Sequence, residues 1–152
     1  MAKFVPFIIK TDGSQNISVK IVRMKKSDAV QTEKEPVWQT SWLSDYIQDD
    51  AFEKYALKTG NGELVALAAY EILENDVMVH ITYIESQPES NPTIVGHSKK
   101  YQGIGRAVSF FAFSLYFLKK ICHNETSIFR FKSRALYWEI RARIQQKRGI
   151  LL

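Results

Sequence analysis

Two glycines, Gly103 and Gly105, stand one residue apart in the sequence YQGIGRAV, directly before a long apolar run. A helix that begins here presents N–H groups without intrahelical partners and the positive end of its dipole. Because glycines leave the backbone open to a close approach, the pattern favours binding of phosphate or pyrophosphate. The glycines are flanked by Lys99, Lys100 and Arg106, which would strengthen the binding of an anion.

The spacing of the glycines excludes two common nucleotide-binding loops. In a dinucleotide-binding G-x-G-x-x-G/A pattern that starts at Gly103, the last position is Val108. A Walker A loop ends in Gly-Lys followed by Ser or Thr, which this chain lacks. The alternative without a ligand is a tight turn whose glycines permit close packing, so the elements around the loop decide between the two interpretations.

The residues before the loop predict three strands in an antiparallel meander. Turn sequences at Gly60-Asn61-Gly62 and Asn75-Asp76 separate apolar stretches at 52–59, 63–73 and 77–84. Further upstream, the pattern predicts an alternating strand over 16–23, a loop or short helix over 24–36 and an amphipathic helix over 38–50.

The residues after the meander predict a polar loop followed by a helix. Residues 86–100 hold two prolines and a glycine and are too broken for a strand or helix. From Gly105 to about residue 121, the apolar pattern predicts a helix that is buried on most sides. A strand over 126–132 and a helix over 133–147 complete the expected order.

The composition fits a single globular domain over residues 1–152. The chain has 152 residues, 45% of them hydrophobic, which is enough for a sizeable core. Its most apolar stretch, residues 107–118, is shorter than the roughly 20 residues that span a bilayer, and its N-terminus lacks the features of a secretory signal. A single cysteine, Cys122, makes no internal disulfide. We therefore expect a cytoplasmic protein without a membrane partner.

Charge is distributed unevenly along the chain. Residues 1–75 carry 9 Lys and Arg against 11 Asp and Glu, whereas residues 76–152 carry 12 against 5. The half that contains the two glycines is therefore strongly basic, which favours a polyanionic ligand or a solvated basic face.

The strand, loop and helix around the glycines resemble the acetyl-CoA-binding signature of the GNAT superfamily of N-acetyltransferases. The family pattern Q/R-x-x-G-x-G/A is matched by the sequence KYQGIG, with Lys100 in place of Gln or Arg. Lysine keeps the charge but lacks the planar fork of arginine. The resemblance extends in element order over roughly residues 15–148. It implies a mixed α+β fold, with a mostly antiparallel sheet whose central strands splay and which is flanked by helices.

The resemblance also implies where coenzyme A (CoA) would bind. In this family the pyrophosphate lies on backbone N–H groups of the signature loop, and the pantetheine arm pairs like an extra strand with the end of the fourth strand. The corresponding cofactor-binding residues here are Tyr83, Ile84, Glu85, Lys100, Gln102, Gly103, Ile104, Gly105 and Arg106. The implied reaction is transfer of an acetyl group from acetyl-CoA to an amine of a small molecule, peptide or protein.

Two residues are the catalytic candidates that follow from this resemblance. Glu85 ends the strand VHITYIE and is the candidate base, acting directly or through water. Tyr137 matches the tyrosine that the family often uses to protonate the leaving thiolate. Each has an alternative without chemistry: Glu85 as a solvated carboxylate, and Tyr137 as a core or surface aromatic. His80 lies within a strand and is expected to be a core or cross-strand residue.

The end of the chain departs from the family pattern. Family members continue past the fourth helix with two further strands, for which a chain that ends at Leu152 has no room. We expect an altered C-terminus without these strands, or a homodimer in which a second subunit supplies the missing pairing. A catalytically silent module that binds CoA or a partner is therefore the first alternative function.

A basic protein that binds tRNA or another nucleic acid is the second alternative. Residues 130–148 hold seven Lys and Arg and only Glu139 as an acid. However, the aromatic residues lie mostly in apolar runs and are not interleaved with the basic tail, which counts against stacking on single strands. No metal site is predicted, because the three histidines and the cysteine are scattered.

Overall fold

A computed structural model describes residues 6–12, 15–73, 78–91, 93–94 and 98–123 of the chain. The chain divides into two compact units, Met1–Tyr116 and Phe117–Leu152. Most of the described residues belong to the first unit, and the second contributes only the last turns of one helix. The strand expected over 126–132 and the helix over 133–147, with Tyr137, lie outside the described residues.

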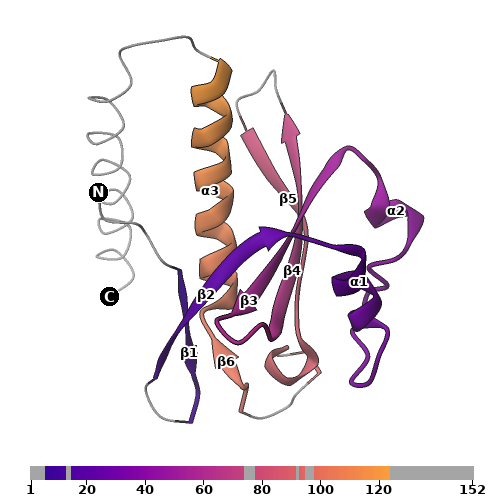
Figure 1. Cartoon of the computed structure of the whole chain (residues 1–152), viewed down its shortest axis with the longest axis vertical. Coiled ribbons are helices and arrows are strands. Elements are labelled where there is room, and N and C mark those ends of the chain that lie inside the picture. Colours follow the sequence, from indigo (N-terminus) through magenta and orange to yellow (C-terminus); the bar gives the residue numbers. More distant parts are fainter. Residues whose placement is uncertain (1–5, 13–14, 74–77, 92, 95–97, 124–152) are drawn as a thin grey trace. The chain divides into compact units, whose positions relative to one another are not determined.

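The first unit contains a six-stranded antiparallel sheet in a mixed α+β arrangement (Figure 1). Its order is β5-β4-β3-β2-β1-β6, and every pairing is antiparallel. The strands are β1 (Phe7–Lys10), β2 (Asn16–Arg23), β3 (Phe52–Thr59), β4 (Leu64–Leu73), β5 (Met78–Ser86) and β6 (Tyr101–Gln102). The helical elements are α1 (Lys26–Thr32), α2 (Asp45–Gln48), the 3-10 turn η1 (Pro88–Ser90) and α3 (Ile104–His123).

The predicted meander is confirmed by β3, β4 and β5. The turn between β3 and β4 closes with a hydrogen bond from the N–H of Gly62 to the carbonyl of Thr59 at 3.0 Å. Gly62 has a φ of +89°, a conformation in which residues with a Cβ are strained. The sequence Gly-Asn-Gly thus supplies a residue that the turn requires.

Two β-bulges change which face of the sheet the side chains occupy. Between β3 and β4 the register skips Val65, and between β4 and β5 it skips Thr82. An extra residue on one strand reverses the alternation beyond it. As a result, Val79 and Ile81 pack on one core of the sheet, whereas Tyr83 packs on the other.

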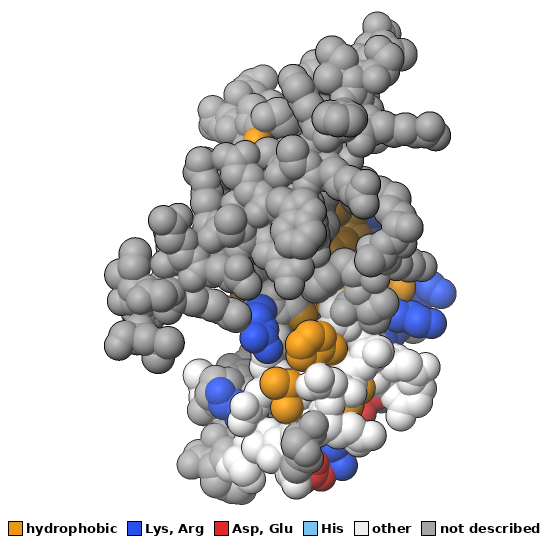
Figure 2. All heavy atoms as spheres, turned by 90° about the vertical axis from the view of Figure 1, so that its left-hand side faces the viewer, with side chains coloured by type: hydrophobic (Ala, Val, Ile, Leu, Met, Phe, Trp, Pro, Cys, Tyr) orange, Lys and Arg blue, Asp and Glu red, His pale blue; other side chains and the backbone are white. Residues whose placement is uncertain are grey.

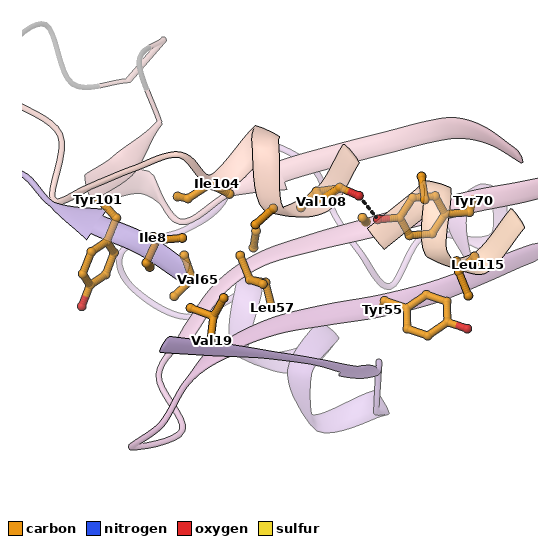
Figure 3. Packing of buried hydrophobic residues seen from close by; sticks show 14 residues of the cluster. Ile8, Val19, Tyr55, Leu57, Val65, Tyr70, Tyr101, Ile104, Val108 and Leu115 are labelled. Atoms are coloured by element: carbon orange, nitrogen blue, oxygen red, sulfur yellow. Dashed lines mark hydrogen bonds between the residues drawn. The ribbon is translucent and has the colours of Figure 1, made fainter. Parts of the chain in front are cut away.

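The larger core lies between the sheet and α3 (Figure 3). Ile104, Val108 and Leu115 of the helix face strand residues such as Leu57 and Tyr70. The hydroxyl of Tyr70 donates a hydrogen bond to the carbonyl of Val108 at 3.1 Å, which satisfies a polar group at the centre of this core. The pKa of Tyr70 is raised by its burial.

The second core lies on the opposite face and is closed by α1, α2 and the segment between them. Its buried members are Ala29, Trp38, Trp42, Ile47, Ala56, Leu64, Leu67 and Ala69. The prediction of a helix over 38–50 is wrong for most of this segment, because only α2 is helical. Trp38 and Trp42 are nevertheless buried, in irregular backbone whose N–H groups bond to a side chain of the sheet.

Helix α3 is longer than the predicted 105–121, and its surroundings also differ from the prediction. Its described side chains are buried along one side, whereas Phe113 is 52% exposed and Arg106 and Ser109 are exposed. The expected burial on most sides is therefore wrong for this part of the helix. Among the described residues, no helix is long and apolar enough to span a membrane.

Candidate functional site

The two glycines lie at the start of α3, where the sequence predicts an anion site. Gly103 has a φ of +83°, and its carbonyl accepts the first helical hydrogen bond, from the N–H of Ala107 at 3.1 Å. Gly103 thus redirects the chain from β6 into the helix through a conformation that favours glycine. The first N–H groups of the helix then point out of its N-terminal end.

A short strand that the sequence did not predict holds this loop in place. Gln102 pairs with Ile9, and Tyr101 pairs with Lys10, in an antiparallel β6–β1 ladder. The N–H of Thr11 donates to the carbonyl of Lys100 at 3.1 Å and extends the contact. Two residues are too few for a periodic signal, so this pairing could not be recognised from the sequence.

The space around the two glycines differs. A Cβ added to Gly105 would meet nothing within 4 Å, whereas one added to Gly103 would lie 3.2 Å from Nη2 of Arg106. The guanidinium of Arg106 therefore covers Gly103, and it also lies 5.8 Å from the ring centre of Phe7. The described surface in Figure 2 has Lys and Arg side chains on both sides of a small hydrophobic patch.

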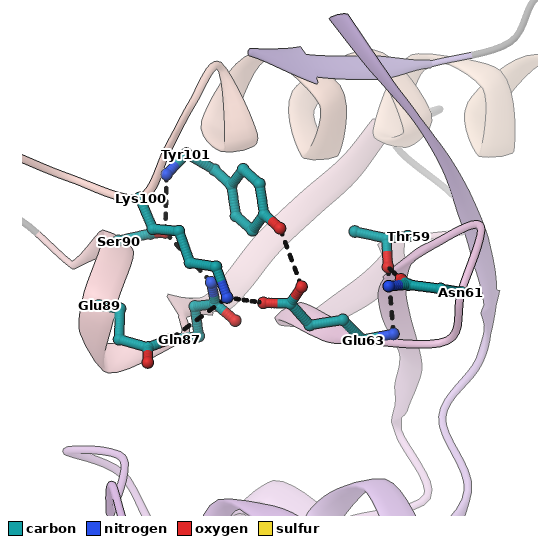
Figure 4. Close-up of polar contacts among 8 residues, drawn as sticks. All are labelled: Thr59, Asn61, Glu63, Gln87, Glu89, Ser90, Lys100 and Tyr101. Carbon is teal, nitrogen blue, oxygen red and sulfur yellow. Dashed lines mark hydrogen bonds and ion pairs between the residues drawn. The ribbon is translucent and has the colours of Figure 1, made fainter. Parts of the chain in front are cut away.

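Lys100, the charged residue of the signature match, is held by two carboxylates. Its Nζ lies 2.6 Å from Oε1 of Glu63 and 3.8 Å from Oε2 of Glu89 (Figure 4). The pKa of Lys100 is raised mainly by the hydrogen bond to Glu63. Its charge therefore stabilises the contact between the β3–β4 turn and the loop before α3.

Glu63 is the centre of this polar cluster, a role that no pattern in the sequence indicates. Its carboxylate also accepts a hydrogen bond from the hydroxyl of Tyr101 at 2.8 Å, and the Gln87 amide is placed to donate to it at 3.1 Å. Partial burial works to raise the pKa of Glu63, but the hydrogen bonds from Lys100 and Tyr101 outweigh it, so the net pKa is lowered.

A surface hollow of about 410 Å³ lies beside this cluster. It is lined by Lys10, Thr11, Asp12, Glu89, Ser98, Lys99 and Lys100. Lys10 forms an ion pair with Asp12 at 2.8 Å, and Lys100 is held as described above. The hollow therefore combines charges of both signs and is not a simple anion pocket.

The other group of predicted site residues lies on β5, at the end of the strand order. Within the part of the chain that the structure describes, one edge of β5 has no partner strand. Tyr83 and Ile84 directly follow the bulge at Thr82, and Ile84 is 46% exposed. Bulges commonly occur next to functional sites, where they redirect side chains.

Glu85, the candidate base, is buried and accepts three hydrogen bonds. Its Oε1 accepts from the N–H of Gln39 at 2.6 Å, and its Oε2 accepts from the N–H of Thr40 at 3.2 Å and from the Trp42 indole at 3.0 Å. Only 8% of the residue is exposed. The alternative of a solvated carboxylate is therefore wrong, and Glu85 instead fastens residues 39–42 to β5.

The end of β5 and the start of α3 are joined through the loop between them. The N–H of Tyr101 donates to Oγ of Ser90 at 3.1 Å, and the N–H of Lys100 donates to the carbonyl of Glu89 at 2.9 Å. The N–H of Gln87 donates to the carbonyl of Val65 at 2.8 Å, which holds the start of the loop on β4. The predicted residues at the end of β5 and those at the start of α3 thus belong to one connected part of the first unit.

The remaining sequence candidates have simpler positions. His80 lies opposite Glu71 in the β4–β5 pairing, with Nδ1 3.8 Å from Oε2, as expected for a cross-strand residue. Among the described residues, no three His, Cys, Asp or Glu side chains are grouped as metal ligands. Tyr137, the candidate acid, lies outside the described residues.

Comparisons of the chain with protein-family models, with curated proteins and with solved structures find no match. The functional assignment therefore depends on the residues and geometry of this chain.

We predict that Glu85→Gln lowers the free energy of unfolding by about 2 to 4 kcal/mol, because the amide cannot accept all three N–H donors and leaves buried groups unsatisfied. Urea unfolding measures the change. The control is Glu71→Gln, whose side chain is partly exposed at 38% and lies 3.8 Å from Nδ1 of His80. Equal stability of the two variants would contradict the role of Glu85 as a buried fastening group.

We also predict that the protein loses stability at low pH and that Glu63 causes part of this loss. The pKa of Glu63 is lowered in the folded state. Its ionised form therefore stabilises the folded protein above the pKa of about 4.3 that it has in the unfolded state, and this stabilisation is lost as the pH falls through the pKa of the folded state. Urea unfolding of the wild type and of Glu63→Gln should differ most at pH 7 and converge toward pH 3. A difference that stays constant between these pH values would contradict the prediction.

Proposed function

We propose that this protein is an N-acetyltransferase that uses acetyl-CoA and an amine acceptor. The observation that carries the proposal is the start of α3, where Gly103 adopts a φ of +83° beneath the guanidinium of Arg106. An exposed helix start, a glycine in this conformation and a covering cation are together suited to a pyrophosphate group.

The residues of this loop fit the phosphate part of CoA. The N–H groups of Ile104, Gly105 and Arg106 belong to the first turn of α3 and are available to phosphate oxygens. The open space at Gly105 leaves room for the ligand to approach the backbone. Arg106 would supply two or more charged donors, whereas Lys100 would contribute charge only at a distance, because Glu63 holds its Nζ.

The edge of β5 fits the pantetheine arm. Amide groups of an extended chain form hydrogen bonds with an unpaired strand edge, as peptides do in strand addition. Tyr83, Ile84 and Glu85 would provide this edge, and the exposed side chain of Ile84 would provide an apolar contact. When bound, acetyl-CoA supplies an activated acetyl group as a thioester.

The acceptor amine must lose a proton to attack the thioester, and the leaving thiolate must gain one. Both oxygens of Glu85 already accept hydrogen bonds, so Glu85 would receive the amine proton through a water at a remaining lone pair. Its second role is to keep residues 39–42 in place beside the acceptor. Tyr137 is the proposed acid for the thiolate.

A module that binds CoA without turnover is the second candidate. The observation in its favour is that Glu85 serves three structural donors, which leaves it less free to act as a base. Release of free thiol from acetyl-CoA across a panel of amines separates the two functions. Binding of CoA without any release would favour the silent module.

We predict that Gly105→Leu abolishes the stabilisation of the protein by millimolar CoA in a thermal-shift assay, while the unliganded melting temperature stays within a few degrees of the wild type. A Cβ at position 105 meets nothing within 4 Å, and the rest of the leucine side chain would block the approach to the first turn of α3. Gly60→Leu is the matched control, because Gly60 also has open space and lies in the β3–β4 turn, outside the first turn of α3.

Gly103→Ala should behave differently from Gly105→Leu. Its positive φ makes any Cβ costly, so this variant should lose roughly 1 to 2 kcal/mol of stability even without CoA. No shift of the wild type by CoA would contradict the proposed cofactor. An unchanged shift in Gly105→Leu would contradict the proposed binding loop.

A further inference from the structure

An exposed group of three aromatic rings lies beside the end of β5. Tyr46 of α2, Phe52 of β3 and Tyr83 of β5 contact one another edge to face, with ring centres 5.6 to 6.3 Å apart. Tyr46 is 66% exposed, and the other two rings are half-buried. Three separate elements therefore bring their rings to one place at the surface, which we call the aromatic triad.

The rings of the aromatic triad are fixed by their surroundings. Phe52 and Tyr83 pack against the core that contains Trp42 and Ile47. A side-chain interaction with Tyr46 is the main reason why the pKa of Tyr83 is raised. Rings that pack on one another in this way lose little further side-chain entropy on binding.

The segment that carries Tyr46 and Phe52 has a negative net charge, although the chain as a whole is basic. Residues 43–54 carry four acids and one lysine, whereas the whole protein has a net charge of +5. Asp45, Asp49 and Asp50 are exposed and lie within a few residues of Tyr46 or Phe52. Glu53 is engaged by Arg23 at 3.1 Å. Aromatic rings attract a cation, and carboxylates in the same segment favour a cation over an anion.

The size of the aromatic triad limits what it can bind. Protein partners usually bury about 800 Å² on each side, whereas these ring centres lie within 6.3 Å of one another. An area of this size fits one alkylammonium group, with its charge over a ring and its chain against the neighbouring rings.

We propose that the aromatic triad is the acceptor subsite and binds a small primary alkylamine in its ammonium form. This inference rests on the proposed acetyl transfer, because it identifies the acceptor class of that same site. Tyr83 lies two residues before Glu85 on the same face of β5, so an ammonium group here would be close to the proposed acetyl donor. Tyr46 and Tyr83 are assigned as residues that determine specificity.

The test is a titration with cadaverine, followed by NMR of the tyrosine and phenylalanine rings without CoA. We expect saturable shifts of the Tyr46, Phe52 and Tyr83 signals, and none with 1,5-pentanediol, which has the same chain length but no charge. Tyr46→Leu should weaken cadaverine binding roughly five-fold or more. Phe113→Leu, which alters an exposed aromatic residue on α3, should leave binding unchanged.

Each other outcome overturns a defined part of this inference. Equal shifts with the diol would show that charge is not recognised. Shifts with a lysine peptide but not with cadaverine would show that the site binds a peptide side chain and not a small alkylamine. If CoA stabilises the protein and cadaverine does not perturb the rings, the acceptor subsite is wrong while the cofactor proposal stands. If cadaverine binds and CoA does not, the ammonium site stands and acetyl transfer fails.

Discussion

The buried carboxylate of Glu85 is the interaction on which this side of the structure depends. Residues between α1 and α2 cover one core of the sheet largely without regular backbone pairing, and Glu85 accepts hydrogen bonds from two of their N–H groups and from the Trp42 indole. A buried charge is tolerated only when its oxygens are satisfied in this way. The position of Trp42, and with it the second core, follows from these bonds.

The same segment also reaches the loop that leads to α3. The side chain of Gln39 accepts hydrogen bonds from Asn91 at 3.2 Å and from Thr93 at 3.1 Å. Residues 39–42 therefore connect the end of β5 with the loop that follows it. In the proposed enzyme, this connection would keep the acceptor side and the cofactor loop in a fixed relation, which group transfer between two bound molecules requires.

Much of the sheet could be predicted from the sequence, because the patterns that indicate its strands and turns involve only residues close together in the chain. The alternation in β2 and the glycine turn before β4 depend only on neighbouring residues, and both agree with the structure. The α1–α2 segment could not be predicted in this way. Trp38, Trp42 and Tyr46 have helical spacing, but Trp42 is held by a carboxylate 43 residues away, and Tyr46 contacts a ring of β5.

The candidate site was predictable only in part for the same reason. The two glycines indicate a backbone that must stay open to a close approach, whereas the positive φ of Gly103 becomes visible only in the structure. The engagement of Lys100 by Glu63 depends on the turn of one hairpin meeting a loop 37 residues later, which no local pattern encodes. The bulge at Thr82 likewise depends on the pairing of two strands rather than on either sequence alone.

An amide NMR titration of the intact chain with CoA tests whether the start of α3 holds the pyrophosphate of CoA, as we propose. We expect the largest saturable shifts at the N–H groups of Gly103, Ile104, Gly105 and Arg106, with smaller shifts along β5. Shifts confined to the hollow around Lys99, or no saturable shifts at all, would contradict this proposal.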